Sequence, residues 1–253
     1  MSTPADAGGQ LRPQADVLVL QHTIEDPAGY LATWLDAVGA RWDVACAEAG
    51  EPYPDSVAGY RALAVLGGEW SANDDRSSLR HAESLIREAD VLGIPVIGHC
   101  LGGQLLTRAL GGSVQRLPKP EIGWLPIGPD GTAAAREWFG DETHAVVYQW
   151  HYDGMVALPP GATVIASSPA CPVQAYTLGP HLGMQFHIEI TPFKIENWLG
   201  NPGAVYPGAV GTHPDTVQAP DTMRAATAAH QASSYRLADR IYGAWQRRWR
   251  PAA

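Results

Sequence analysis

The sequence is poor in charge and in long apolar segments, and each shortage excludes a class of protein. Charged residues make up 17% of the 253 residues, and 17 Lys and Arg against 26 Asp and Glu give a formal net charge of −9. Binding to nucleic acid requires a basic face, so we expect no nucleic-acid partner. No apolar run reaches the roughly 18 residues of a membrane span, and residues 1–16 lack the pattern of a signal peptide. We therefore expect a cytoplasmic protein with no membrane partner.

Cysteine is also scarce, which excludes a disulfide framework. The three cysteines are Cys46, Cys100 and Cys171, and none forms a Cys-x-x-Cys pair. No pair of histidines has a convincing zinc-ligand spacing either, so we predict no metal and no other cofactor. Hydrophobic residues make up 45% of the chain, the usual share for a globular protein with a substantial core.

The first half of the sequence alternates short apolar runs with amphipathic segments, which predicts alternating strands and helices. We expect strands at 16–21, 42–46, 60–66 and 94–98, and helices at 27–39, 77–92 and 101–110. This alternation is typical of a parallel sheet with helices on both faces.

After about Ser113 the apolar runs follow one another without helices, which predicts an antiparallel portion. These runs are 122–127, 145–150, 163–166, 173–178 and 182–187, with a hairpin turn at Gly179-Pro180. A short helix over 191–199, a long loop over 200–220 and a helix over 221–249 complete the chain. We predict a flexible tail over 1–14 and a single α/β domain over 15–253, with its core at 16–199 and a C-terminal loop and helix at 200–253.

The most informative segment follows the predicted strand 94–98 and opens a helix. It reads Gly98-His99-Cys100-Leu101-Gly102-Gly103-Gln104, and a cysteine in Gly-x-Cys-x-Gly at such a place has the form of a nucleophile elbow. The turn is so tight that the residues two before and two after the nucleophile must be small, and Gly98 and Gly102 meet this requirement. The helix N-terminus favours a negative charge on the sulfur, and the backbone N–H of Leu101 points where an oxyanion would form. We therefore predict that Cys100 is a nucleophile and that Cys46 and Cys171 are packing residues.

A thiolate nucleophile needs a histidine base, and His187 is the first candidate. His187 and Glu189 lie two residues apart, so their side chains point the same way in an extended chain. Glu189 can then hold one ring nitrogen and leave the other for Cys100. His151 is the alternative base and is otherwise part of a substrate-binding wall. We expect His99 to point away from the nucleophile, and we expect six histidines at the surface or in loops: His22, His81, His144, His181, His213 and His230.

These residues resemble the class I (triad) glutamine amidotransferase family, in particular its stand-alone members often called GMP synthase-like. The elbow resembles the family's Gly-x-Cys-x-Gly-x-Gln motif, and the segment Gln185-Phe186-His187-Ile188-Glu189 resembles its Gln-Phe-His-Pro-Glu motif. Gly67-Gly68 after a strand resembles the family's oxyanion loop. The similarity runs from about residue 16 to 199.

The resemblance implies a flavodoxin-like fold, a doubly wound and mostly parallel sheet, and a glutaminase half-reaction. Cys100 would attack the side-chain amide of glutamine and form a γ-glutamyl thioester, while His187, supported by Glu189, would protonate the leaving ammonia and then activate water. The N–H groups of Gly68 and Leu101 would hold the oxyanion. The residues that would hold glutamine are Gly67, Gln104, Trp150, His151 and Tyr152.

Three positions depart from the family pattern: Ile188 and Glu69 stand where proline is common, and Tyr152 where glycine is common. The last two leave a second reading open, in which the same triad serves a γ-glutamyl peptidase or hydrolase. A third reading is a non-catalytic binding subunit, although the intact triad speaks against it. The chain has no P-loop run, so we do not expect it to make GMP by itself. The expected partners are glutamine or a γ-glutamyl compound and a separate ammonia-accepting synthase.

Overall fold

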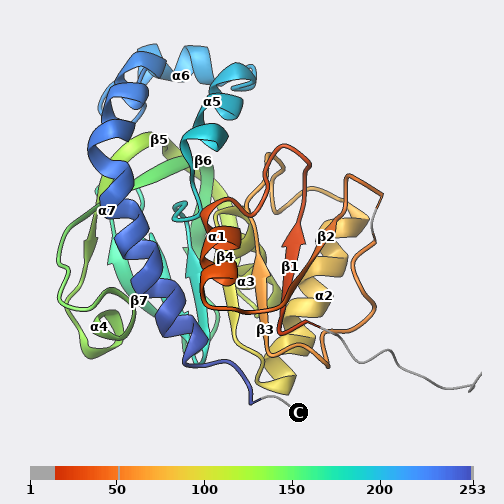
Figure 1. The fold of residues 1–253 in the computed structure, drawn as a ribbon. Coiled ribbons are helices and arrows are strands. Elements are labelled where there is room, and N and C mark those ends of the chain that lie inside the picture. Colours follow the sequence, from red (N-terminus) through yellow and green to blue (C-terminus); the bar gives the residue numbers. More distant parts are fainter. Residues whose placement is uncertain (1–14, 51, 252–253) are drawn as a thin grey trace, which may run out of the picture.

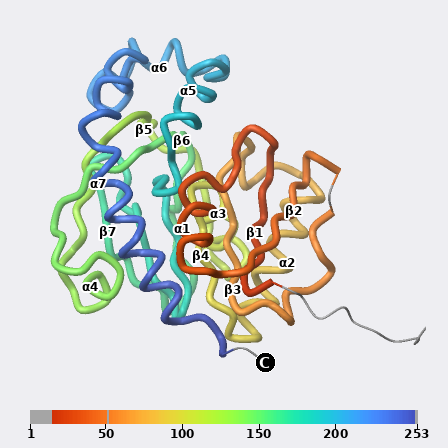
Figure 2. Tube along the Cα trace, viewed as in Figure 1, coloured from red at the N-terminus to blue at the C-terminus, as the bar shows by residue number. Residues whose placement is uncertain are grey.

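The computed structural model describes residues 15–50 and 52–251, so the tail predicted over residues 1–14 lies outside the described residues. In the described part of the chain, nine strands form one sheet in the order β2-β1-β3-β4-β9-β8-β7-β5-β6. Helices lie in front of this sheet and behind it, as Figure 1 and Figure 2 show. The predicted α/β fold, a parallel core joined to an antiparallel portion, is confirmed.

The parallel core is made of strands that are buried on both faces. It contains β1 (Val17–Gln21), β2 (Trp42–Cys46), β3 (Ala62–Val65), β4 (Val96–His99) and β9 (His181–Met184), each paired in parallel with its neighbour. Four of the five are almost continuously apolar because helices cover them on both sides. The fifth, β2, lies at the edge and is partly exposed.

Alternate residues of β1 show how the two faces are filled. Val17 and Val19 pack in one cluster with residues of α1 and α7, whereas Leu18 and Leu20 pack in another with residues of α2 and α3. The helices concerned are α1 (Tyr30–Ala37), α2 (Ser77–Leu92), α3 (Leu101–Ala109) and α7 (Pro220–Gln246). Two apolar layers therefore hold the parallel core between them.

The antiparallel portion contains one long hairpin and two shorter strands. These are β5 (Ser113–Pro129), β6 (Ala145–Ala157), β7 (Thr163–Ser167) and β8 (Ala175–Leu178). The hairpin of β5 and β6 changes register between Arg116 and Glu121. The predicted turn at Gly179-Pro180 joins β8 to β9 in antiparallel pairing, with Gly179 at φ +52°.

Two helices correct the prediction for the second half. The sequence predicted strands without helices between them, but α4 (Ala133–Phe139) follows β5, and the Thr132 side chain caps it by accepting from the Ala135 N–H. The expected loop over 200–220 contains α6 (Tyr206–Thr212). Both segments are short and rich in Ala or Gly, and packing rather than an apolar period holds them: Trp138, Phe139 and Tyr206 are buried.

A third apolar cluster stands at the end of the sheet where the parallel strands finish. It joins α5 (Pro192–Gly200) and α6 to the hairpin of β5 and β6 and to the start of α7. In Figure 1, β1 points toward the same end of the molecule as α5 and α6. Thr191 caps α5 as predicted, through its hydroxyl and the Lys194 N–H. Among the described helices, none has the combined length and hydropathy that a membrane crossing requires.

Candidate active site

Cys100 stands on a strained turn between β4 and α3. Its φ of +47° is the one positive value among the non-glycine residues of the described chain. The backbone leaves no room for larger neighbours: a Cβ on Gly98 would lie 2.6 Å from the Gly102 carbonyl carbon, and one on Gly102 would lie 2.0 Å from the Val65 oxygen. The predicted elbow geometry is therefore present, and such strain is typical of a functional residue.

The His187 ring and the Glu189 carboxylate meet as the spacing predicted. His187 Nδ1 lies 2.6 Å from Glu189 Oε1, and both side chains are buried. The other ring nitrogen, Nε2, is buried and has no hydrogen-bond partner among the described residues. His187 and Cys100 line the same cavity. The strand ends earlier than predicted, at Met184, and His187 is held instead by an isolated bridge to Tyr148.

Electrostatics favours the charged forms of this pair. Burial by itself lowers the pKa of His187, but the negative charges of Glu189 and of the Cys100 sulfur outweigh it and raise the pKa to about 10. Burial likewise works against the Glu189 carboxylate, and the positive charges of His187 and Lys194 hold its pKa well below the ordinary value. A His187 imidazolium beside an ionised Glu189 carboxylate is thus the favoured state near neutral pH.

Lys194 is a functional candidate that the sequence analysis missed. Its ammonium is fully buried, lies 2.5 Å from Asp26 Oδ1 and 3.4 Å from Glu189 Oε1, and donates to the Pro27 carbonyl at 2.9 Å. The signal was available: a lysine in the first turn of a helix opposes the helix dipole, so a compensating anion was needed nearby. We call Asp26, Lys194, Glu189 and His187 the charge cluster.

The cavity in front of Cys100 has a volume of about 680 Å³. Seven of the other predicted site residues line it: Gly68, Leu101, Gln104, Trp150, His151, Tyr152 and His187. Gly67 and Glu189 lie behind the lining. A Cβ on Gly67 would lie 2.9 Å from His187 Cε1 and 3.0 Å from Asp26 Oδ2, so only glycine fits between these two side chains.

The Gln104 side chain donates hydrogen bonds to other groups of the site. Its amide nitrogen donates to the Asp153 carbonyl and to Gln185 Oε1, both at 3.2 Å, and Gln185 Nε2 in turn lies 3.5 Å from Cys100 Sγ. Asp153 also accepts from the Ser71 hydroxyl at 2.7 Å. The amide donor of Gln104 is therefore already used within the protein.

The ring of His151, the alternative base, is directed to other groups than Cys100. Nε2 lies 3.1 Å from Glu121 Oε2 and Nδ1 lies 3.1 Å from the Asp153 carbonyl. Glu121 also accepts from Ser168 and Gln174, each at 2.7 Å. We call these four side chains (Glu121, His151, Ser168 and Gln174) the wall network. It pins β5 to β6 beside Trp150 and Tyr152.

Cys171 lies next to the wall network and completes a possible set of metal ligands. Ligand atoms of Glu121, His151 and Cys171 lie within 4.8 Å of one another, the one such group found in the described residues. Each of the three side chains already has a protein partner. Glu121 and His151 contact each other, and Cys171 Sγ lies 3.2 Å from the Val173 carbonyl oxygen. Burial, followed by the charge of Glu121, raises the pKa of the Cys171 thiol to about 12, which disfavours the thiolate that a metal needs.

One histidine corrects the prediction of surface or loop positions: His181 lies in strand β9 and is fully buried. His22 lies in the loop after β1, as that prediction allowed, but it too is fully buried. His22 packs behind Gly68 with Nδ1 2.8 Å from the Tyr53 hydroxyl, and burial lowers its pKa to about 4. His181 contacts Asp90 at 3.1 Å. The residues that contact these two histidines, such as Tyr53 and Asp90, come from distant segments of the chain, so the local sequence does not reveal the burial. His99 turns to Tyr242, away from the cavity, as predicted.

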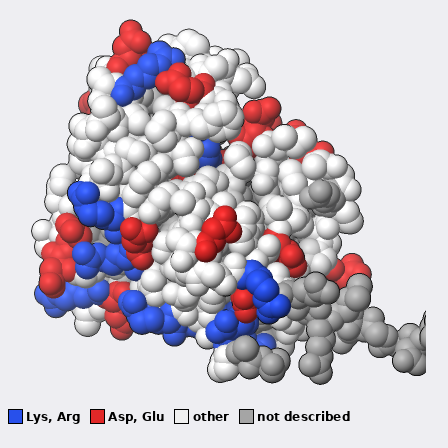
Figure 3. Space-filling model, viewed as in Figure 1, with Lys and Arg blue, Asp and Glu red and all other residues white. Residues whose placement is uncertain are grey.

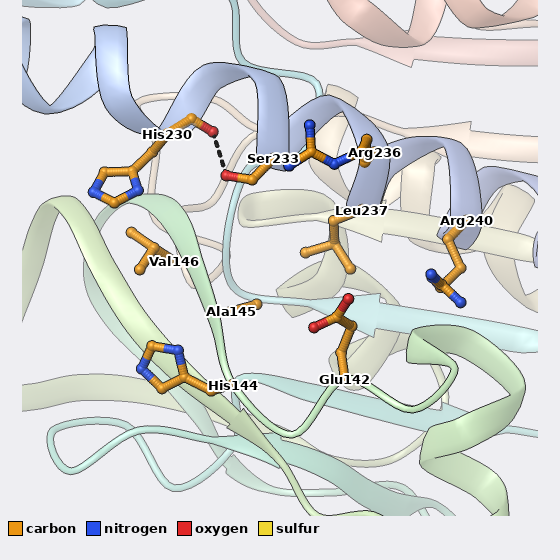
Figure 4. A pocket seen from close by; sticks show the side chains of 9 residues that line it. All are labelled: Glu142, His144, Ala145, Val146, His230, Ser233, Arg236, Leu237 and Arg240. Atoms are coloured by element: carbon orange, nitrogen blue, oxygen red, sulfur yellow. Dashed lines mark hydrogen bonds between the residues drawn. The ribbon is translucent and has the colours of Figure 1, made fainter.

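A second cavity, of about 340 Å³, lies between the start of β6 and α7. Figure 4 shows Glu142 and His144 on one side and Arg240 on α7, with the Ser233 hydroxyl bonded to the His230 carbonyl at 2.8 Å. It shares no lining residue with the Cys100 cavity.

Comparison with known proteins shows the family. The family model "Glutamine amidotransferase class-I" matches residues 41–197. The glutamine amidotransferase-like protein YfeJ of Salmonella typhimurium is 33% identical over 190 residues, which are 72% of this chain and 78% of that protein. A crystal structure of a glutamine amidotransferase from Methylobacillus flagellatus gives a TM-score of 0.88 at 32% identity, over 94% of this chain and 97% of that one. The chain belongs to the class I glutamine amidotransferases, a family of amide-cleaving enzymes.

Longer relatives match over a smaller share of their length. The GMP synthase (glutamine-hydrolyzing) of Aromatoleum aromaticum is 39% identical over 108 residues, or 40% of this chain and 21% of that protein. The chain thus matches about a fifth of the length of that synthase.

We predict that Lys194→Met destabilises the protein, because it leaves two buried carboxylates without their shared cation. Breaking a buried ion pair costs about 3–5 kcal/mol, and urea unfolding measures this. The chain has one other lysine, Lys119, whose ion pair with Asp215 is exposed. Lys119→Met is the matched control and should change the unfolding midpoint little. Equal midpoints for the two variants would contradict the importance of the charge cluster.

We also predict a pH dependence of stability from His187. Its pKa is raised from 6.5 to about 10 in the folded protein, so the folded state holds a proton that the unfolded chain releases. This contribution is complete below pH 6.5 and is lost as the pH rises toward about 10. The urea midpoint of wild type should fall over this window more than that of His187→Gln. His144→Gln, at an exposed position, should keep the wild-type dependence, and a parallel fall in all three proteins would exclude a protonated His187.

Proposed function

We propose that this protein hydrolyses a γ-glutamyl amide, with glutamine as the family's substrate, through a thioester on Cys100. One observation carries the proposal: Cys100 stands on a strained elbow and lines the same cavity as His187, and His187 Nδ1 lies 2.6 Å from Glu189 Oε1. The three side chains meet the requirements of a nucleophile, a base and a group that orients the base.

The geometry supports a two-step reaction. The Cys100 sulfur attacks the γ-carbonyl carbon and forms a C–S bond, and the N–H groups of Gly68 and Leu101 stabilise the oxyanion. The C–N bond then breaks as His187 gives its Nε2 proton to the leaving nitrogen. In the second step His187 takes a proton from water, the water oxygen attacks the thioester, and glutamate leaves while the sulfur regains its negative charge.

The charge cluster supports both steps. Because Glu189 and Cys100 outweigh burial and raise the pKa of His187 to about 10, the imidazolium is ready to donate to the leaving nitrogen. Once the sulfur is acylated, its charge disappears, and with it one of the causes that raise that pKa. The same ring then becomes a better base for water at the moment a base is required.

We further propose that the released ammonia serves a separate synthase. The matched relative from Aromatoleum aromaticum is a glutamine-hydrolyzing GMP synthase of which this chain spans 21%, so an acceptor domain would have to come from another polypeptide or from sequence beyond this chain.

The test measures glutamate release from glutamine and labelling by a glutamine-like chloroketone. Cys100→Ala should lower kcat by at least about 10³-fold, and Glu189→Gln should lower kcat less. Cys46→Ala, in strand β2, is the control and should keep wild-type turnover. Peptide mapping should find the adduct on Cys100. Unchanged turnover in Cys100→Ala, or an adduct confined to another residue, would overturn the proposal.

A further inference from the structure

We propose that the Cys100 cavity is built for a γ-glutamyl amide whose leaving amine carries a second, positive charge, such as the amide of an aliphatic diamine. This rests on the proposed thioester chemistry and specifies the amine that is released. Three observations carry it: the size of the cavity, the two groups of residues in its lining, and the charge of each group.

The cavity is larger than glutamine requires. Its volume of about 680 Å³ lies within the ~300–1,000 Å³ range of pockets that enclose drug-sized ligands. Glutamine is a much smaller molecule, and its leaving group is only ammonia. The residues Asn201–Val205, between α5 and α6, also line the cavity, so there is room for a substituent on the scissile nitrogen.

The position of His187 fixes which side receives that substituent. His187 Nε2 is buried and has no hydrogen-bond partner among the described residues, and in the proposed reaction it donates the proton to the leaving nitrogen. The leaving amine therefore lies on the side of His187, which we call the leaving-group side. Two neighbours define it: Asp26 Oδ2, which flanks Gly67 together with the His187 ring, and Trp198, whose ring centroid is 4.9 Å from that of His187.

A second group of lining residues suits the glutamyl part of the substrate. Gln104 donates to the Asp153 carbonyl, and the Arg116 guanidinium lies 4.3 Å over the Tyr152 ring and 3.9 Å from Asp153. Arg116 is the one Lys or Arg among the described residues that line the cavity. A guanidinium is a good partner for the α-carboxylate of a glutamyl group.

The leaving-group side carries an excess of negative charge. Glu25 lines the cavity and directly precedes Asp26 in the chain, and Glu48 accepts only from the Ile24 N–H at 2.7 Å among the described residues. Glu25, like Glu69 of the same lining, has no hydrogen-bond or ion-pair partner among the described residues. Asp26 is already paired with Lys194. On the face in Figure 3, acidic groups gather at the upper edge of the half that holds β1 and β2, with no basic group among them. An ammonium on the substrate would supply the missing charge.

The apolar surface between these groups fits the methylene chain of such an amine. Trp198 and Trp150 both line the cavity, with ring centroids 5.8 Å apart. A chain leaving the scissile nitrogen would pack along Trp198 and bring its terminal ammonium toward Glu25 and Glu48. The chemistry stays balanced: the C–N bond breaks, the His187 proton goes to the leaving nitrogen, and a free diamine departs in place of ammonia.

The experiment compares glutamate release from three substrates: glutamine, γ-glutamyl-1,4-diaminobutane and γ-glutamyl-butylamine. The two amides have the same chain and differ in the terminal ammonium. We expect kcat/KM for the diamine amide to exceed that for the butylamide by at least about 10-fold, and the ratio to fall with salt because the carboxylates are exposed. The double variant Glu25→Gln/Glu48→Gln should bring the ratio close to one. Glu142→Gln, in the second cavity, should keep the wild-type ratio.

The outcomes separate this inference from the proposed function. If glutamine is hydrolysed and the two amides react equally, or neither reacts, the inference is wrong and the proposed glutaminase activity stands. If the ratio is high but unchanged in the double variant, Glu25 and Glu48 do not form the ammonium site and the inference fails. If glutamate is released from none of the three, the proposed function itself is overturned.

Discussion

The charge cluster is the constraint on which the rest of the site depends. Burying Asp26, Glu189, Lys194 and an imidazolium in one place is tolerable only because two negative and two positive charges balance. The ammonium of Lys194 joins the loop after β1 to the first turn of α5. It thereby holds Glu189 in position and keeps that carboxylate ionised. The base of the proposed reaction is thus oriented by a carboxylate that is itself oriented by a lysine from the next helix.

The topology of the sheet brings this cluster to the nucleophile. β4 and β9 are parallel neighbours with His99 opposite Met184, and the Cys100 N–H donates to the Met184 carbonyl at 2.9 Å. Both strands therefore end at the same edge of the sheet, one directly before Cys100 and the other three residues before His187. A Cβ on Gly103 would lie 2.4 Å from the Met184 oxygen, so α3 can lie this close to β9 only with glycine there.

Local sequence was sufficient for the parts of the site that are local. The elbow is a strand, a cysteine between glycines and a helix within a few residues, and His187 with Glu189 is a spacing of two. Lys194 is paired with Asp26, which lies in a loop far away in the chain, and no periodicity of the sequence reports that contact. His22 and His181 are buried by distant segments for the same reason. The helix α4 was missed because only three of its residues, Ala135, Trp138 and Phe139, are buried in the core, and this pattern is too short to distinguish from a loop.

The charge cluster and the wall network have different roles in the site. The charge cluster sets the protonation of His187, while the wall network fixes the hairpin that carries Trp150 and Tyr152. Every side chain of the wall network has a partner, and a satisfied buried network is rigid because any change leaves a group unpaired. Glu25, Glu48 and Glu69, in contrast, are exposed and stand on loops. Substitutions there cost little stability, so the amine that the site accepts can change while the cysteine, the histidine and their supports stay as they are.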